Sequence, residues 1–134
     1  MKIIFLDIDG VLNSRMFLLG LAGMTWDNDD QKMIDPAAVV LLNELIARTA
    51  AKVVLSSSWR YNHTPAGMQR LLETQGFVGE VIDRTPTAFE DVNVPYGETR
   101  QRGHEIMSWL EEHTDVTSFV ILDDDGDMAR LRAR

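Results

Sequence analysis

The residues with the clearest chemical potential are two aspartates near the start of the chain, Asp7 and Asp9, separated by one residue. They follow Ile3–Leu6, an apolar run that predicts a buried strand of a parallel sheet. Two like charges this close at the edge of a core repel each other unless a positive charge balances them. A hard divalent cation is the simplest balance, because it prefers carboxylate oxygens as ligands. The pair therefore indicates the catalytic carboxylates of a magnesium-dependent site for phosphate transfer.

Three segments with the apolar spacing of amphipathic helices follow this strand. The first begins at Asp35-Pro36 and the second at Thr64-Pro65, where an N-cap acceptor precedes a proline at the first helical position. The third helix is expected over residues 99–113. The side chains of the first helix that we expect to face the core are Ala38, Leu41, Leu42, Leu45 and Ile46.

Three further apolar runs predict the remaining strands, at residues 52–56, 81–82 and 119–122. Strands alternate with helices, which is typical of βαβ units around a parallel sheet. The first strand ends at Asp7, the second in Ser56, and the last is followed by Asp123. In open parallel sheets, ligands bind at the carboxyl ends of the strands. Polar residues from three distant parts of the sequence are therefore expected to meet at one edge of the sheet.

The composition limits the class of protein. The chain has 134 residues, which predicts a single domain over 1–134, and a hydrophobic content of 45% is enough for a core. A net charge of −8 argues against a broad surface that coats nucleic acid, but a local pocket for a nucleic-acid end remains compatible. No cysteine is present, which excludes disulfides and Cys-ligated zinc. Neither a signal peptide nor an apolar stretch of ~20 residues is found, so we expect a cytoplasmic protein without membrane contact.

Taken in order, these motifs resemble those of the haloacid dehalogenase-like (HAD) superfamily of phosphatases, and most closely the HAD domain of Swiss-army-knife RNA repair proteins. The resemblance covers nearly the whole chain. It implies a three-layer α/β/α Rossmann-like fold with a small parallel sheet and no large cap domain. The residues that carry it are Asp7-Ile8-Asp9-Gly10, Ser56, Ser57-Ser58-Trp59-Arg60, Arg102-Gly103 and Leu122-Asp123-Asp124-Asp125.

The resemblance also implies the catalytic roles. Asp7 would attack phosphorus to form an aspartyl-phosphate, and Asp9 would act as the general acid and base. Ser56 would donate a hydrogen bond to a phosphoryl oxygen. The run of three serines leaves the register open, so Ser57 shares this role as a substrate-binding candidate. An isolated serine at a strand end more often caps the next turn.

The implied cofactor is Mg²⁺, held by Asp7, the backbone carbonyl of Asp9 and Asp123, with Asp124 a ligand directly or through water. Magnesium keeps several waters, so two or three carboxylates suffice. For the acidic run that begins at Asp123, a solvated turn is the alternative. A calcium loop of the EF-hand kind is excluded, because no glutamate stands at the required twelfth position.

Arg102 breaks a local rule, which points to a functional role. It lies in the first turn of the expected third helix, where the helix dipole disfavours a cation. Gly103 beside it costs about 1 kcal/mol relative to alanine in a helix interior. Rules broken side by side are expected at functional sites. A cation there would neutralise Asp7 and the incoming phosphate, and Arg100 is the rival for this role.

Two other residues are substrate-binding candidates. Arg60 could clamp a phosphate in a bidentate fashion, and its alternative is a surface arginine stacked on Trp59. Gly10 fits a chain that must turn sharply after the first strand, beside the bound phosphate.

The function expected from these features is hydrolysis of a phosphate monoester on a nucleotide or a nucleic-acid end. Segment 14–34 is either a short packed flap or a lid over the site. One alternative is a phosphatase of small metabolites whose site is closed by a partner subunit. Another is an inactive module that binds phosphate or protein. The chain is short after the last acidic motif, so a homodimer is one way to cover the sheet edge; the chain's own basic tail is the other.

Overall fold

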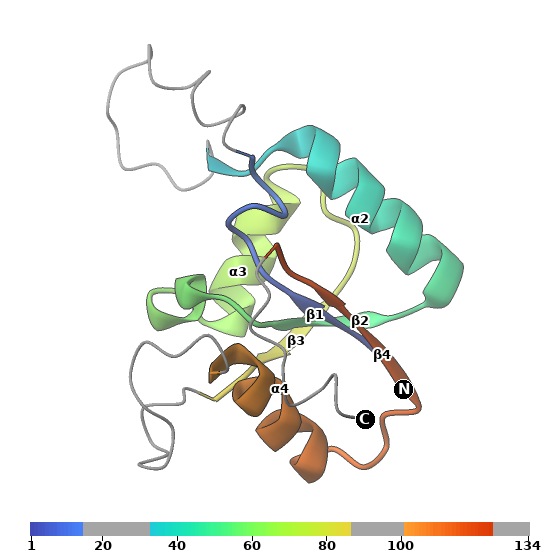
Figure 1. Cartoon of the computed structure of the whole chain (residues 1–134). Coiled ribbons are helices and arrows are strands. Elements are labelled where there is room, and N and C mark those ends of the chain that lie inside the picture. Colours follow the sequence, from blue (N-terminus) through green and yellow to red (C-terminus); the bar gives the residue numbers. More distant parts are fainter. Residues whose placement is uncertain (15–32, 87–100, 125–134) are drawn as a thin grey trace.

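Four parallel strands form one sheet in the order β3-β2-β1-β4 (Figure 1). The strands are β1 (Lys2–Leu6), β2 (Lys52–Leu55), β3 (Val81–Arg84) and β4 (Ser118–Leu122). The structure is a computed structural model that describes residues 1–14, 33–86 and 101–124. All four predicted strands are therefore confirmed, and β1 lies inside the sheet between β2 and β4.

The helices are α2 (Pro36–Thr49), α3 (Pro65–Glu73) and α4 (Gln101–Glu112), with a short 3₁₀ helix, η2 (Ser58–Tyr61), directly after β2. The predicted helix starts are confirmed at α2 and α3. The Asp35 carboxylate accepts from the backbone N–H of Ala37, and the Thr64 hydroxyl accepts from that of Gly67. In each helix a proline follows the cap, where its missing N–H has no helical partner to lose.

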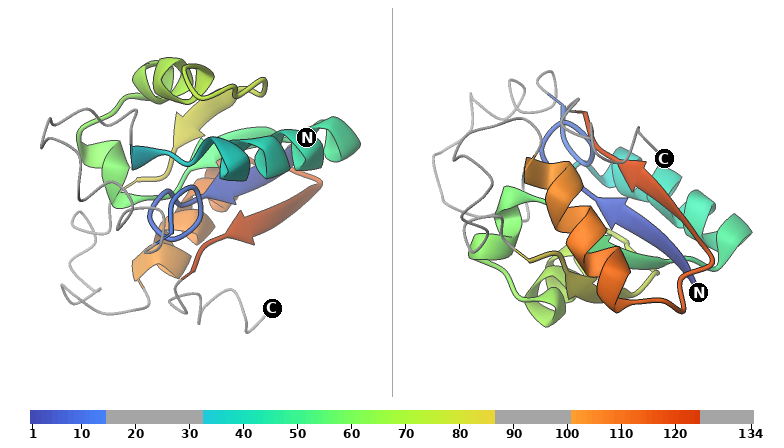
Figure 2. Two further views of the ribbon diagram at one scale, coloured as in Figure 1. Left: turned by 90° about the horizontal axis from the view of Figure 1, so that it is seen from above. Right: turned by 60° about the horizontal axis from the view of Figure 1, so that its bottom comes forward.

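Helices cover both faces of the sheet, so the fold has the three layers expected from the sequence (Figure 2). Successive side chains of a strand point to opposite faces. Ile4 and Leu6 of β1 accordingly pack in one buried cluster with residues of α2 and α3, whereas Ile3 and Phe5 pack in a second cluster with α4. A strand buried on both faces explains why β1 is apolar throughout its buried part instead of alternating with polar residues.

One predicted core position of α2 is wrong. Leu41 is 67% exposed, whereas Val39, which was not predicted, is fully buried beside Leu42. Val39 and Leu42 are three residues apart and define the centre of the buried stripe. Leu41 lies one residue, about 100° of helical rotation, from Leu42, which takes it off that stripe.

None of the described helices is long and apolar enough to cross a membrane. Most of the predicted flap or lid, residues 15–32, lies outside the described residues, as do residues 87–100 and 125–134, which include Arg100 and the basic tail. Between the motifs, the described part of the chain shows no additional domain.

Candidate active site at the carboxyl ends of the strands

The register of the sheet brings the three predicted polar residues level with one another. Leu6 of β1 lies opposite Leu55 of β2 and Leu122 of β4. The next residues in each strand are Asp7, Ser56 and Asp123. The backbone N–H of Ser56 donates to the Leu6 carbonyl at 2.8 Å, and that of Asp7 donates to the Leu122 carbonyl at 3.0 Å. The predicted convergence at one edge is thus present.

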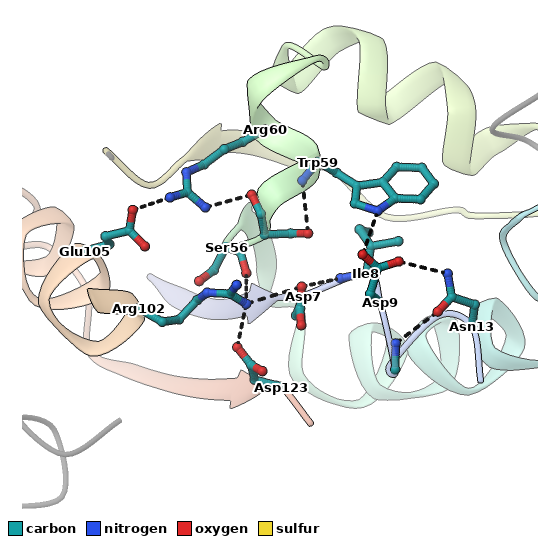
Figure 3. Close-up of polar contacts among 12 residues, drawn as sticks. Asp7, Ile8, Asp9, Asn13, Ser56, Trp59, Arg60, Arg102, Glu105 and Asp123 are labelled. Carbon is teal, nitrogen blue, oxygen red and sulfur yellow. Dashed lines mark hydrogen bonds and ion pairs between the residues drawn. The ribbon is translucent and has the colours of Figure 1, made fainter. Parts of the chain in front are cut away.

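Strand alternation also decides which way these side chains point. Phe5, Val54 and Ile121 all pack in the cluster on the α4 side of the sheet. Because side chains repeat every two residues, the residues two positions further on are directed to the same side. Asp7, Ser56 and Asp123 therefore face the N-terminal end of α4, as Figure 3 shows.

Arg102, in the first turn of α4, provides the cation for this group. Its Nη1 lies 2.8 Å from Asp123 Oδ2 and 3.3 Å from Asp7 Oδ1, and it donates to the Ser56 carbonyl at 3.1 Å (Figure 3). One guanidinium therefore contacts residues at the ends of three strands. Two carboxylates on one cation explain why α4 carries a positive charge where its dipole disfavours one.

Asp7 is nevertheless an unusual carboxyl group. Its pKa is raised from the ordinary 3.8 to about 6. Burial is the largest cause, and the neighbouring Asp123 charge adds to it, whereas Arg102 is the main opposing influence. Hydrogen bonds from the Ser57 hydroxyl and from the backbone N–H of Ile8, at 2.9 Å, also lower it. The fold thus holds a carboxylate where its charge is incompletely compensated, as expected of a site that takes a further cation.

This raised pKa predicts a pH dependence of the stability of the metal-free protein. Asp7 contributes stability that is fully present below pH 3.8 and is lost as the pH rises through about 6. Relative to Asp7→Asn, which resembles the protonated form, the wild-type free energy of unfolding should fall by on the order of 2–3 kcal/mol between pH 4 and pH 7. Urea unfolding with a chelator, at a series of pH values, measures the difference.

The control for this experiment is Glu44→Gln, which neutralises an exposed carboxylate on α2. Its stability should follow the wild-type pH profile. If Asp7→Asn also ran parallel to wild type from pH 4 to pH 7, the carboxyl group of Asp7 would not be held at a raised pKa.

The second aspartate lies on a tight turn after β1 and is held by two side chains. Trp59 Nε1 donates to Asp9 Oδ2 at 3.2 Å, and Asn13 Nδ2 donates to Asp9 Oδ1 at 3.3 Å (Figure 3). Asn13 also closes the turn, because its Oδ1 accepts from the backbone N–H of Gly10 at 2.9 Å. Asp9 remains exposed, so its carboxylate is accessible to a substrate.

Gly10 is required at this turn for two reasons. Its φ is +82°, in the region that favours glycine. A Cβ there would also lie only 2.0 Å from Asp124 Oδ2. The side chain of Asp124 is therefore seated against the backbone that follows Asp9. Substrate binding by Gly10 stays a prediction, since its N–H is engaged by Asn13.

The two serines after β2 have different surroundings. Ser57 Oγ accepts from the backbone N–H of Trp59 at 3.3 Å, so it caps η2 as well as bonding Asp7. Ser56 Oγ is buried and has no hydrogen-bond partner among the described residues. An unpaired buried hydroxyl costs about 1–3 kcal/mol, and a ligand oxygen would recover it. This supports Ser56 as the phosphate-binding serine of the two.

Arg60 is placed inside the molecule. It is 4% exposed and forms an ion pair with Glu105 of α4, itself 5% exposed, while its Nη1 donates to the Ser57 carbonyl at 2.7 Å. A buried guanidinium committed to these partners does not favour the predicted substrate clamp. It is not a surface arginine either. The ion pair of Arg60 with Glu105 instead connects the serine loop (residues 56–58, after β2) to α4, the helix that carries Arg102.

Among the described residues, Asp7, Asp123 and Asp124 form a group that could hold a metal ion, since each offers an oxygen within 4.8 Å of the others. An all-oxygen set of carboxylates suits Mg²⁺. With the backbone carbonyl of Asp9, these are the predicted ligands. The chemistry of the donor set and the incompletely compensated charge at Asp7 therefore fit a divalent cation.

Sequence reasoning missed the supporting roles of three residues, of which Trp59 was named only as part of a motif and as a stacking partner for Arg60. Asn13 lies four residues after Asp9 in the same turn, a position from which an amide can close the turn. Trp59 and Glu105 contact the site across 50 and 45 residues of sequence. A buried partner for Arg60 could have been sought among the few acidic residues on apolar helix faces, of which Glu105 is one.

The comparison with protein families gives one match. A family model described as the HAD domain in Swiss Army Knife RNA repair proteins matches residues 3–134. No curated protein and no solved structure matches the sequence.

Proposed function

The chain belongs to the family of HAD domains found in Swiss Army Knife RNA repair proteins, and from this membership we propose that it is a magnesium-dependent phosphatase. Its substrate would be a phosphate monoester on a nucleotide or a polynucleotide end. The observation that carries the proposal is the group formed by Asp7, Arg102 and Asp123 at the strand ends. A buried carboxylate with a raised pKa beside a fixed cation is a candidate nucleophile for phosphoryl transfer.

In the proposed reaction, a carboxylate oxygen of Asp7 attacks phosphorus, and the bond from phosphorus to the ester oxygen breaks. Asp9, protonated at this stage, gives its proton to the departing alkoxide, so that an alcohol leaves. The aspartyl-phosphate on Asp7 is then attacked by water, from which Asp9 removes a proton. Inorganic phosphate leaves and Asp7 is regenerated, with Asp9 again protonated.

The remaining groups would stabilise charge. Arg102, which contacts Asp7, would also contact a phosphoryl oxygen, and the buried hydroxyl of Ser56 would be a further donor. Mg²⁺ bound by Asp7, Asp123, Asp124 and the Asp9 carbonyl would neutralise the phosphate charge when present. Uncatalysed hydrolysis of phosphate monoesters is so slow that roughly 20 kcal/mol of barrier reduction is needed, mostly from such charge stabilisation.

A nucleic-acid end is the substrate class that the family description favours, since its members stand in RNA repair proteins. Segments 15–32 and 87–100, which lie between the motifs and outside the described residues, are too short for a large cap domain, which would leave the site open to a bulky substrate. A net charge of −8 is compatible with this, because binding an end requires only a local positive group.

The test is release of inorganic phosphate with Mg²⁺ and with a chelator. The substrates are oligonucleotides with a 3′- or a 5′-phosphate, free nucleotides and sugar phosphates. We expect Mg²⁺-dependent turnover with the highest kcat/KM on an oligonucleotide end. A strong preference for sugar phosphates would favour the small-metabolite phosphatase. No Mg²⁺-stimulated turnover on any of them would favour a binding module.

A further inference from the structure

The contact between Trp59 and Asp9 has a consequence for catalysis. We propose that Trp59 is a positioning residue, whose indole N–H orients the carboxyl group of Asp9 for proton transfer to the leaving oxygen. This inference rests on the proposed phosphatase function. Orienting Asp9 is a task that is assigned neither to the proposed nucleophile, Asp7, nor to the charge-stabilising groups Arg102 and Ser56.

The first reason is that Asp9 needs support. It lies on the turn after β1, and its carboxyl group is exposed. An exposed aspartate samples several rotamers unless partners select one. A proton donor must lie within hydrogen-bond distance of the atom it protonates, and a misplacement of 1 Å can cost about 10²-fold in rate. A partner that fixes the carboxyl group of Asp9 can therefore change the reaction rate strongly.

The second reason is that Trp59 is itself fixed. Its ring is stacked on that of His63, with centroids 5.4 Å apart and planes 23° apart, and it packs against the core cluster on the α2 side of the sheet. His63 Nδ1 is 2.9 Å from the backbone carbonyl of Trp59, and the backbone N–H of Trp59 donates to Ser57 Oγ. The indole N–H is held at Asp9 Oδ2 by η2 (Figure 3), which follows the strand that ends beside Ser56.

The third reason concerns the division of labour between the two donors on Asp9. Asn13 holds Oδ1, but it also closes the turn at Gly10 and donates to the Met33 carbonyl at 3.1 Å. Asn13 is therefore needed to build the turn. The indole N–H of Trp59 is a single donor whose hydrogen bond in the structure goes to Asp9. Its removal changes the support of Asp9 and leaves the bonds of the turn in place.

Both hydrogen bonds to Asp9 are longer than the most common N–H···O distance of about 2.9–3.0 Å, at 3.2 and 3.3 Å. A carboxyl group has about four lone-pair positions, so one donor on each oxygen leaves room for a proton and for a substrate oxygen. The arrangement orients Asp9 without occupying it fully.

The experiment replaces Trp59 by Phe, which keeps an aromatic ring and removes the N–H. It compares kcat/KM on a nucleoside 3′-phosphate with that on p-nitrophenyl phosphate. kcat/KM covers the steps up to release of the alcohol. An alkoxide needs a proton from Asp9 to leave, whereas p-nitrophenolate leaves as a stable anion. We expect kcat/KM to fall roughly 10- to 100-fold on the nucleotide and less than about threefold on the aryl ester.

Two further variants calibrate the measurement. Asp9→Asn shows the full substrate-dependent loss. Trp109→Phe makes the same chemical change on α4, where the indole Nε1 donates to Asp83 of β3 at 2.8 Å and not to Asp9. The ratio of the two kcat/KM values does not depend on how much protein is folded. Trp109→Phe should therefore leave this ratio unchanged, and Trp59→Phe should move it toward that of Asp9→Asn.

The possible failures are separable. An equal loss on both substrates, or no loss on the nucleotide, overturns the role of Trp59 while the phosphatase stands. If wild type shows no turnover that depends on Asp7, the proposed function is overturned and the role of Trp59 with it.

Discussion

Replacement of Asp7 by Asn is expected to abolish phosphatase activity, with a loss in kcat on the order of 10⁴-fold or more. The amide is nearly the same size but is neither a nucleophile nor a charged ligand for a cation. The same change removes the buried charge that the fold compensates incompletely, so the protein should remain folded. Turnover on the best substrate of the wild-type protein measures the effect.

A direct readout of the covalent step accompanies this measurement. Acid quenching of wild type during turnover of a ³²P-labelled substrate should leave label on the protein, because an acyl phosphate survives acid. Asp7→Asn should carry none. Labelled Asp7→Asn, or Asp7→Asn with activity close to wild type, would show that Asp7 is not the nucleophile and would favour an inactive or differently organised site.

Asp7→Asn combines two opposite expectations in one variant. At neutral pH and without metal it should be more stable than wild type, because the pKa of Asp7 is raised to about 6 by burial and by Asp123. A variant that gains stability and loses activity separates function from folding. A position that is costly for stability and valuable for catalysis is typical of an active site.

The fold was predictable because its signals are local. Asp35-Pro36 and Thr64-Pro65 mark helix starts within a few residues of sequence, and apolar runs mark the strands. The convergence of Asp7, Ser56 and Asp123 followed from a rule of parallel sheets, and the register confirms it. Strand alternation then places each of these side chains on the same face as the residue two positions before it, but that α4 covers this face is a result of tertiary packing.

The supporting contacts were not predictable because they depend on tertiary packing. Arg60 looked like a phosphate clamp from its type, but its environment is set by Glu105 on a helix that follows much later in the chain. Breaking such a buried pair costs about 3–5 kcal/mol of folding stability. The main role of the Arg60–Glu105 pair is therefore to stabilise the position of the serine loop. The contact of Trp59 with Asp9 is equally distant in sequence. Which face of α2 is buried also depends on how the helix packs on the sheet, which places Val39 in the core and Leu41 in solvent.

The second large effect is expected at Arg102. Arg102→Ala removes a guanidinium that contacts Asp7, Asp123 and the Ser56 carbonyl together, and it leaves two carboxylates facing each other. We expect kcat/KM to fall by roughly 10²- to 10³-fold, the usual cost of losing one charge-stabilising donor at a transition state. Arg102→Lys should recover part of this, because it restores the charge but not the planar fork of donors.

Magnesium dependence decides how this loss is to be understood. If Arg102 acts on the transferred phosphoryl group, saturating Mg²⁺ should not restore the activity of Arg102→Ala. If its only task were to hold Asp7 and Asp123 for the metal, excess Mg²⁺ would restore it, and a direct catalytic role would be wrong. Arg48→Ala, an exposed arginine in the last turn of α2, is the matched control and should behave as wild type.

The metal-free protein offers an independent check on the same residue. Burial raises the pKa of Asp7, and Arg102 is the main influence that lowers it. Without Arg102 that pKa must rise further, so Asp7 titrates at a higher pH and the stability loss on raising the pH shifts upward with it. Urea unfolding of Arg102→Ala against pH, with a chelator present, should show this shift relative to wild type. An unshifted profile would mean that the 3.3 Å contact between Arg102 and Asp7 carries little energy, and the cation that compensates Asp7 would have to be found elsewhere.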